Sequence, residues 1–279
     1  MSLDILTINY NDKNADKLFE ESLKNTGFAV IKDHPISSDL INQVYEEWKN
    51  YFSSESKIDY IFDETKQDGY FPYLTENAKG STAKDLKEFY HIYQWGRLPE
   101  MIGPKTMNLY GELTNVASTF LSWVQKNAPD FVTKLFSIPL KDMIYQSQSN
   151  LLRIIHYPPL SGNEETNSIR AAAHEDINLL TVLVAGSQPG LQVLDKNGNW
   201  LDVSTNKNTI VINSGDMLKM VSDKYYPSTT HRVINPEPNS NLSRYSMPLF
   251  LHPRDEVVLN ENYTAGSYLQ ERLQEIGLK

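Results

Sequence analysis

Short β-rich runs dominate the chain from about residue 144 onward. Turn-forming residues separate these runs, which are Leu151–Ile155, Leu179–Val184, Leu191–Leu194, Trp200–Val203, Thr209–Ile212 and Tyr245–Leu251. Two of them flank the segment Asp195–Asn199, whose Asn-Gly pair is a strong hairpin signal. Several short strands in succession without helices between them predict an antiparallel sandwich or barrel.

The first 140 residues show helical spacing instead. One apolar stripe ends at Gly27, which we expect to stop a helix before a short strand at Phe28–Ile31. Ser38 is the expected cap of a second helix, and residues 109–124 carry the clearest amphipathic pattern. The pattern predicts an α+β fold with a helical N-terminal layer on the β core.

Two further segments are less regular. Residues 56–104 are mixed, because glycine and proline interrupt every long run. Ser267–Ile276 is predicted to form a terminal helix. The chain contains no repeat and no low-complexity linker, which favours a single domain over residues 1–279.

The chain of 279 residues contains no cysteine, which excludes thiolate metal sites, disulfides and a cysteine nucleophile. Metal ligands would come mainly from six His and 35 Asp and Glu. The net charge of −9 argues against nucleic-acid binding. The start MSLDILTINYND lacks the features of a signal peptide, and the longest aliphatic stretch is too short to span a membrane. We therefore expect a cytoplasmic protein that binds neither membrane nor nucleic acid, and the oligomeric state stays open.

A candidate metal site begins at His174-Glu175-Asp176, just before a predicted strand. On an extended chain His174 and Asp176 point to the same face. His231, after 54 intervening residues, can complete the group. Two imidazoles and one carboxylate form the facial triad of non-haem Fe(II) oxygenases, with positions left open for a co-substrate and dioxygen. The same ligands also suit zinc, so a zinc hydrolase or a binding protein remains an alternative.

Arg244 and Ser246 add a second element, 13 residues after His231. Both would lie on one face of an apolar strand, where a guanidinium can grip a carboxylate through two hydrogen bonds and a hydroxyl can add a third. Holding the distal carboxylate of 2-oxoglutarate requires such a pair. A surface salt bridge is the alternative for Arg244.

The stretch from 150 to 254 resembles the 2-oxoglutarate/Fe(II)-dependent dioxygenase superfamily, specifically its isopenicillin N synthase-like group. The matching segments are LLRIIHYPP (151–159), RAAAHEDINLLTVL (170–183), GLQVLDKNGNWLDV (190–203), INSGDML (212–218), STTHRV (228–233) and RYSMPLF (244–250), with TGFAVIKDHPIS (26–37) and DLKEFYHI (85–92) in the N-terminal half. The resemblance implies a double-stranded β-helix (jelly-roll) core with a helical N-terminal layer and a C-terminal helix. It places the N-terminal helical region at 1–143, the Fe(II)/2-oxoglutarate core at 144–255 and a tail at 256–279.

The resemblance also implies roles for individual residues. It assigns the catalytic metal ligands to His174, Asp176 and His231. It assigns contacts with the co-substrate to Arg244, Ser246 and Tyr157, and a substrate pocket to Phe250, Tyr90, His91 and Tyr73. Two positions depart from the pattern: Ile155 stands where plant members usually have Asn, and Glu175 replaces the usual Thr. By alternation Glu175 faces away from the metal, so we expect little effect of it on iron binding.

The resemblance implies an oxygenase that uses Fe(II), 2-oxoglutarate and O2, with ascorbate as a candidate reductant. Such an enzyme oxidises a C–H bond of a small molecule and releases succinate and CO2. Isopenicillin N synthase dispenses with 2-oxoglutarate, so an Fe(II) oxidase of that type is one alternative. A non-catalytic or zinc-binding jelly roll is another.

Overall fold

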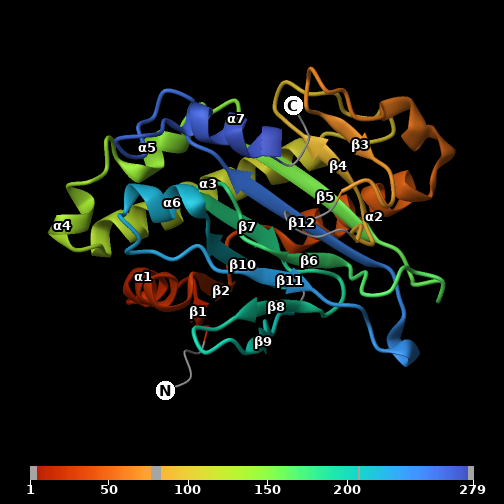
Figure 1. The fold of residues 1–279 in the computed structure, drawn as a ribbon, viewed down its shortest axis with the longest axis horizontal. Coiled ribbons are helices and arrows are strands. Elements are labelled where there is room, and N and C mark those ends of the chain that lie inside the picture. The colour runs from red at the N-terminus through yellow and green to blue at the C-terminus, as the bar shows by residue number, and fades with distance from the viewer. Residues whose placement is uncertain (1–4, 77–82, 207, 276–279) are drawn as a thin grey trace.

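The computed structural model describes residues 5–76, 83–206 and 208–275. Their strands form a large and a small sheet (Figure 1). Buried apolar side chains from both sheets form one cluster between them. The large sheet has the order β1 (Thr7–Asn9), β2 (Phe28–Lys32), β10 (Thr209–Ser214), β7 (Leu180–Val184), β12 (Arg244–Leu251), β5 (Leu151–Tyr157), β4 (Glu88–Ile92) and β3 (Gly69–Phe71). The small sheet has the order β6 (Ala171–His174), β11 (His231–Val233), β8 (Leu191–Leu194) and β9 (Trp200–Asp202).

The pairing confirms the predicted antiparallel barrel. In the large sheet β12 pairs antiparallel with β5 and β7, and β10 pairs antiparallel with β7 and β2. In the small sheet β11 pairs antiparallel with β6 and β8. The fold is therefore α+β with a double-stranded β-helix core, as the resemblance implied.

The helices of the described residues are α1 (Ala15–Thr26), α2 (Ser38–Ser53) and α3 (Lys105–Asn127), with the shorter α4 (Asp130–Thr133), α5 (Leu140–Ile144) and α6 (Asp216–Val221), the terminal α7 (Ala265–Glu275), and the 3-10 turns η1 (Glu55–Tyr60) and η2 (Pro238–Ser240). Helices α1, α2 and α3 cover the outer face of the large sheet, and the other helices lie in the connections around it. Trp48 of α2 and Phe120 of α3 are fully buried against the sheet in the main core cluster. The predicted helical layer and terminal helix are confirmed, although Ile276 lies outside the described residues.

The helix ends follow the sequence signals with one correction. Helix α1 ends before Gly27, which adopts φ 73° and donates its N–H to the Leu23 carbonyl. Glycine adopts this left-handed conformation without steric cost. The predicted cap Ser38 is wrong: Ser37 is the N-cap of α2, and its hydroxyl accepts a hydrogen bond from the Leu40 N–H. The extended backbone needed at a cap falls one residue earlier than expected.

Alternation along the strands separates two apolar layers. Tyr245, Met247 and Leu249 of β12 join the cluster under the helices. The opposite parity, which includes Arg244, Ser246 and Phe250, therefore faces the barrel interior. Neighbouring strands continue this inner wall with Ile155 and Tyr157 of β5 and Phe89 of β4. The inner wall of β4, β5 and β12 positions the candidate site.

Candidate functional site

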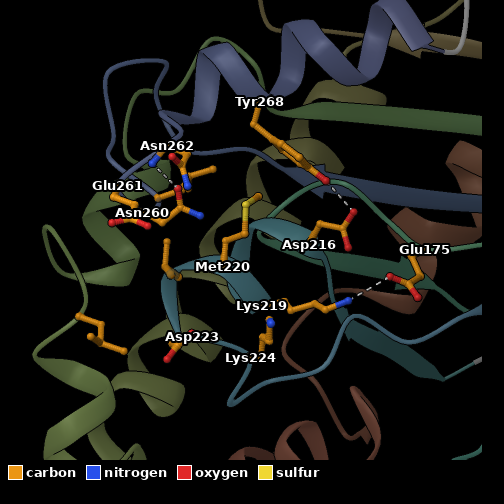
Figure 2. A pocket seen from close by; sticks show the side chains of 13 residues that line it. Glu175, Asp216, Lys219, Met220, Asp223, Lys224, Asn260, Glu261, Asn262 and Tyr268 are labelled. Carbon is orange, nitrogen blue, oxygen red and sulfur yellow. Dashed lines mark hydrogen bonds and ion pairs between the residues drawn. The ribbon is translucent and has the colours of Figure 1, made fainter.

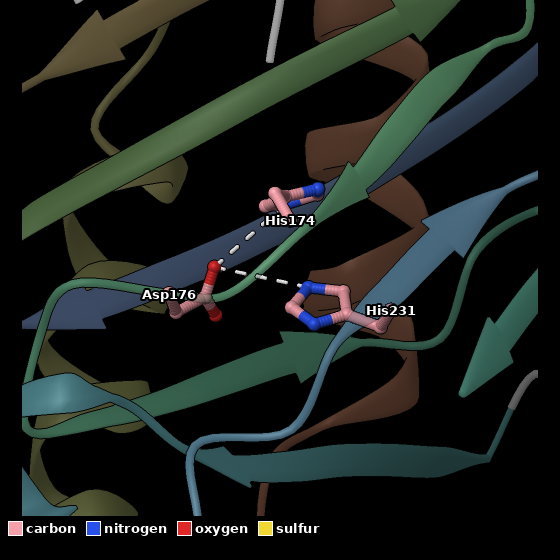
Figure 3. A group of neighbouring side chains, drawn as sticks. All are labelled: His174, Asp176 and His231. Atoms are coloured by element: carbon pink, nitrogen blue, oxygen red, sulfur yellow. Dashed lines mark ion pairs between the residues drawn. The ribbon is translucent and has the colours of Figure 1, made fainter. Parts of the chain in front are cut away.

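The three predicted metal ligands lie together at one end of the barrel (Figure 3). His174 ends β6 and His231 begins β11, and the two residues are directly paired in register. Asp176 lies two residues beyond His174, and its Oδ1 is 3.9 Å from His174 Nε2 and 3.7 Å from His231 Nε2. One potential ligand atom from each of the three residues lies within 4.8 Å of the others. Among the described residues, no other three His, Asp or Glu side chains gather this closely.

Hydrogen bonds orient each of the three side chains. His174 Nδ1 lies 2.7 Å from the Ala172 carbonyl, and His231 Nδ1 lies 3.1 Å from the Thr229 carbonyl. A carbonyl only accepts, so both Nδ1 atoms carry the proton and both Nε2 atoms keep a free lone pair. This is the tautomer that a metal-binding imidazole requires.

The Asp176 carboxylate is fixed in the same way. Its Oδ2 accepts hydrogen bonds from Thr181 Oγ1 at 2.6 Å and Asn213 Nδ2 at 2.7 Å. Its Oδ1 is left facing the two imidazoles. Asn213 lies on β10, one residue beyond the predicted strand Thr209–Ile212, and this position makes it a hydrogen-bond partner of Asp176.

The protonation states suit a cation. Burial lowers the pKa of His174 to about 4, and the neighbouring His231 contributes in the same direction. Burial opposes ionisation of Asp176, but His231, His174 and the two hydrogen bonds outweigh it and lower the pKa of the carboxyl. At neutral pH the group therefore presents a neutral His174 imidazole and a carboxylate, which is the state that binds a metal ion.

The three residues predicted to contact the co-substrate also lie together on the inner wall. Arg244 pairs in register with Tyr157, and its guanidinium carbon lies 5.2 Å from the centre of the Tyr157 ring. Ser246 shares this face, opposite Ile155, which offers no polar atom. The Arg244 guanidinium packs so closely on Gly186 that a Cβ at that position would lie 2.5 Å from Nη2.

A second buried arginine, which the sequence reading missed, lies near Arg244. Arg170 is 1% exposed, and its Nη2 donates to the Leu242 carbonyl at 2.5 Å. Burial lowers the pKa of Arg170 to about 10, with the charge of Arg244 acting in the same direction. Arg170 Nε and Arg244 Nη1 are buried without a hydrogen-bond partner. Neither arginine forms an ion pair with any described residue, so the interior here carries uncompensated positive charge.

The four residues predicted to line a substrate pocket do not all lie on the same face of the sheet. Phe250 and His91 both face the interior, where Arg153 lies between them: its Nε donates to His91 Nε2 at 2.9 Å, and its guanidinium carbon is 5.5 Å from the centre of the Phe250 ring. Tyr90 has the opposite parity on β4 and lies in the core under the helices, fully buried, with its hydroxyl on the Arg97 carbonyl. Tyr90 therefore does not lie on the inner wall. The sequence pattern at 56–104 predicted mixed structure, but β4 is a regular strand, along which neighbouring side chains face opposite sides. Tyr73 lies in the turn after β3, and burial and the charge of Glu164 raise the pKa of its hydroxyl.

A groove of about 750 Å³ lies outside the barrel between α6, α7 and the turn at 259–262 (Figure 2). The three clustered side chains do not line it, and Glu175 does. The Glu175 carboxylate contacts Lys219 Nζ at 3.5 Å and Thr230 Oγ1 at 3.2 Å. Glu175 therefore points away from the side of the chain on which His174 and Asp176 gather, as the alternation predicted, and its small effect on iron binding stays a prediction. Among the described residues, no helix combines the length and apolarity needed to cross a membrane.

A jelly-roll barrel with two imidazoles and a carboxylate at one end defines the class of non-haem metal oxygenases. Known proteins agree with this class. The 2OG-Fe(II) oxygenase superfamily matches residues 148–253, and the family described as non-haem dioxygenase in morphine synthesis N-terminal matches residues 4–110. The chain belongs to the 2OG-Fe(II) oxygenase superfamily and is a 2-oxoglutarate- and Fe(II)-dependent oxygenase with dioxygen as co-substrate.

Individual relatives cover nearly the whole chain. A Shewanella oneidensis protein designated an oxygenase is 49% identical, with a TM-score of 0.89 and full coverage of both chains. A 2-oxoglutarate-Fe(II) type oxidoreductase of Aspergillus fumigatus is 25% identical over 260 residues, covering 85% of this chain and 76% of the relative. Neurospora crassa T7H, solved in complex with alpha-KG and thymine, has a TM-score of 0.78 at 21% identity and covers 98% of this chain and 99% of its own.

Proposed function

We propose that His174, Asp176 and His231 are the protein ligands of Fe(II) in this oxygenase. The observation that carries the proposal is the gathering of their ligand atoms within 4.8 Å. Two imidazole nitrogens with free lone pairs and one ionised carboxylate oxygen are donors that suit Fe(II). The partly exposed His174 side chain, at 37%, leaves the group accessible from the barrel opening.

Arg244 and Ser246 are proposed to hold the distal carboxylate of 2-oxoglutarate, with the Tyr157 hydroxyl in contact with the same molecule. In support, the Arg244 guanidinium is 2% exposed and has no acidic partner among the described residues. A buried charge without a counter-ion is costly, and an anionic ligand removes that cost. The positive charge of Arg170 nearby favours the same anion.

The chain's own residues then have distinct tasks. Bound Fe(II) supplies dioxygen activation coupled to decarboxylation of 2-oxoglutarate to succinate and CO2, with oxidation of a substrate C–H bond. Thr181 and Asn213 hold the Asp176 carboxylate in one orientation, so the ligand does not have to reorganise. The Ala172 and Thr229 carbonyls keep both Nδ1 atoms protonated, and Arg244 fixes the far end of the co-substrate.

The substrate is a small molecule, and we propose that Phe250 and His91 line its pocket. Support comes from their place on the inner wall, where Phe250 is the residue of β12 that keeps accessible surface. Tyr90 is left out of this proposal because it faces the helices. The alternatives without 2-oxoglutarate or with zinc are favoured by no observation on the described residues.

Other finer assignments remain proposals. We propose membership of the isopenicillin N synthase-like group and a cytoplasmic location, both on the sequence alone. The division into 1–143, 144–255 and 256–279 within one domain is likewise proposed, and so is the lack of nucleic-acid binding, for which the net charge of −9 is the support.

Anaerobic titration tests the ligand assignment. Fe(II)-loaded protein should develop a visible charge-transfer band when 2-oxoglutarate is added, and aerobic protein should release succinate when a substrate is supplied. Asp176→Ala should lose Fe(II) binding and both signals. Glu175→Gln is the matched control, because this neighbouring carboxylate contacts Lys219 and Thr230 instead of the triad. Full Fe(II) binding and turnover in Asp176→Ala would disprove the assignment.

A further inference from the structure

A hydrogen-bonded chain of three side chains lies on the face of the large sheet opposite to Arg244. His156 of β5 is directly paired with Tyr245 of β12 on one side and with Glu88 of β4 on the other. Ser243 immediately precedes β12 and has the parity of Tyr245. The side chains of Ser243, His156 and Glu88 therefore come from three neighbouring segments and meet on the side of the sheet that the helices cover.

The imidazole of His156 connects the other two side chains. Its Nε2 lies 3.1 Å from Ser243 Oγ, and its Nδ1 lies 2.7 Å from Glu88 Oε1. An ionised carboxylate only accepts hydrogen bonds, so Nδ1 carries the proton and Nε2 presents its lone pair to the serine hydroxyl. A hydroxyl, an imidazole and a carboxylate connected in this order can activate a serine as a nucleophile.

Further hydrogen bonds keep the Glu88 carboxyl ionised. Burial opposes ionisation, but hydrogen bonds from His156, Lys57 and Tyr70 outweigh it and lower the pKa of the carboxyl. Lys57 Nζ lies 2.8 Å from Oε2, and the Tyr70 hydroxyl donates to the same oxygen. Oε1 faces His156 Nδ1. The carboxylate can therefore hold the imidazole in one tautomer and stabilise the positive charge that forms when His156 takes a second proton.

Aromatic rings fix the plane of the imidazole. The ring of Tyr245 stacks on His156 with 4.5 Å between the ring centres and 7° between the planes, and the Phe52 ring of α2 lies 5.5 Å away. The His156 side chain is 12% exposed, and Ser243 is partly exposed. The imidazole is therefore oriented before any ligand binds, next to a serine that keeps accessible surface.

A proton donor also lies beside the serine. Burial raises the pKa of the Tyr245 hydroxyl, while a hydrogen bond with Ser243 acts in the opposite direction. At neutral pH this phenol is therefore protonated. Once Ser243 gives its own proton to His156, the Tyr245 hydroxyl can donate to an oxygen next to the serine, where negative charge develops during acyl transfer.

We propose that Ser243, His156 and Glu88 form a second catalytic site, which hydrolyses small carboxylic esters without using the metal. His156 Nε2 takes the proton of Ser243 as Oγ bonds to the carbonyl carbon of the ester. The imidazolium then gives this proton to the leaving alkoxide as the ester C–O bond breaks. Water next attacks the acyl group, its proton passing to His156 and then to Ser243 Oγ, which releases the carboxylic acid and restores the serine. Nothing is oxidised or reduced, and Glu88 acts as a positioning residue.

A chromogenic ester and a label for activated serines test the proposal. Fe(II)-loaded protein is kept under nitrogen with excess 2-oxoglutarate, so that neither oxidation nor an open metal position contributes. It is mixed with p-nitrophenyl acetate or with an alkyl fluorophosphonate, and modified peptides are identified by mass spectrometry. We expect release of p-nitrophenolate and phosphonylation of Ser243. Absence of hydrolysis, or hydrolysis with neither an acetyl nor a phosphonyl group on Ser243, would overturn the proposal.

Variants connect the reaction to these side chains. Ser243→Ala should abolish labelling and return hydrolysis to the background rate, and His156→Gln should lower the rate about a hundredfold or more, because the general base is lost. Ser240→Ala is the matched control, since this exposed hydroxyl, three residues earlier in η2, donates to the Glu237 carbonyl instead of facing an imidazole. A hydrolysis rate in Ser243→Ala equal to that of the unmodified protein would contradict the assignment.

A cysteine variant keeps the test decisive where His156→Gln fails to fold. The chain contains no cysteine, so Ser243→Cys introduces a single thiol. An imidazole beside this thiol favours the thiolate, and iodoacetamide should alkylate it at pH 7 about tenfold faster than the thiol of Ser240→Cys. Equal alkylation rates in the two variants would show that His156 does not act as a base toward residue 243.

Discussion

Replacing Arg244 by Met should raise the stability of the ligand-free protein while it removes co-substrate binding. The Arg244 guanidinium is 2% exposed, it donates from Nε to the Gln188 carbonyl at 3.0 Å, and Nη1 has no partner. A buried charge without a counter-ion costs about 3–5 kcal/mol. Met is flexible and similar in length, so it can occupy the space beside Gly186.

The expected gain is smaller than that cost, because Arg244→Met also removes favourable contacts. The hydrogen bond to Gln188 contributes about 1.5–3 kcal/mol as a bond from a charged group. The stacking on Tyr157 contributes about 1 kcal/mol. The net stabilisation is then about 1 kcal/mol, which corresponds to a rise of roughly 2–4 °C in Tm for a chain of this size.

Binding of 2-oxoglutarate should change in the opposite direction. Removing one partner of a buried charge pair costs about 2–5 kcal/mol, which weakens binding roughly thirtyfold to several thousandfold. Scanning calorimetry of the metal-free protein and titration of the Fe(II)-loaded protein with 2-oxoglutarate measure the two effects. Arg232 of β11 is the control, because its guanidinium also stacks on an aromatic ring, 3.9 Å from the centre of Trp200. Arg232→Met should leave 2-oxoglutarate binding unchanged and should not raise Tm. An Arg244→Met protein that is destabilised and still binds 2-oxoglutarate normally would refute the reasoning.

Three other predictions concern the site and the core. Asn213→Leu removes the 2.7 Å hydrogen bond to Asp176 and should weaken Fe(II) binding about 10–100-fold in a metal titration, whereas unchanged affinity would show that Thr181 alone suffices. Burial lowers the pKa of His252 to about 4, below its ordinary value of about 6.5, so the unfolded state binds the extra proton between these values. The Tm of the metal-free protein should therefore fall as the pH decreases from about 6.5 to 4, and His252→Gln should reduce that slope. Phe120→Ala removes a fully buried ring stacked on Phe19 and should cost about 3–5 kcal/mol in urea unfolding, with less than 1 kcal/mol marking a core that collapses around the cavity.

Periodicity identified the elements that are long or strongly patterned. The strand at Leu151–Tyr157 and the long helix α3 were predictable because each carries many apolar residues at one spacing. Periodicity could not predict strand β6, because Ala-Ala-Ala-His carries no strand preference. This segment owes its extended conformation to pairing with β11. The metal ligand at its end was found through the motif instead of the strand.

The wrong expectation about Tyr90 arose because the sequence pattern did not predict strand β4. Strand β4 lies in a segment interrupted by glycine and proline, and without it the parity of neighbouring residues could not be applied. Tyr90 and His91 were therefore grouped, although adjacent residues of one strand face opposite sides. Arg153, Arg170 and Asn213 gave no local signal, because their importance comes from partners that are distant in the sequence.

Two groups of charged side chains on the inner wall of the barrel differ in their charge balance. Glu76 and Asp85 balance the charges of Arg153 and Lys87, so this group of side chains is neutral without a ligand. The charge of Arg244 is neutralised only when an anion binds, so the folded protein without a ligand keeps a buried charge that has no counter-ion. We therefore expect the uncompensated charge of Arg244 to favour binding of an anionic co-substrate such as a dicarboxylate.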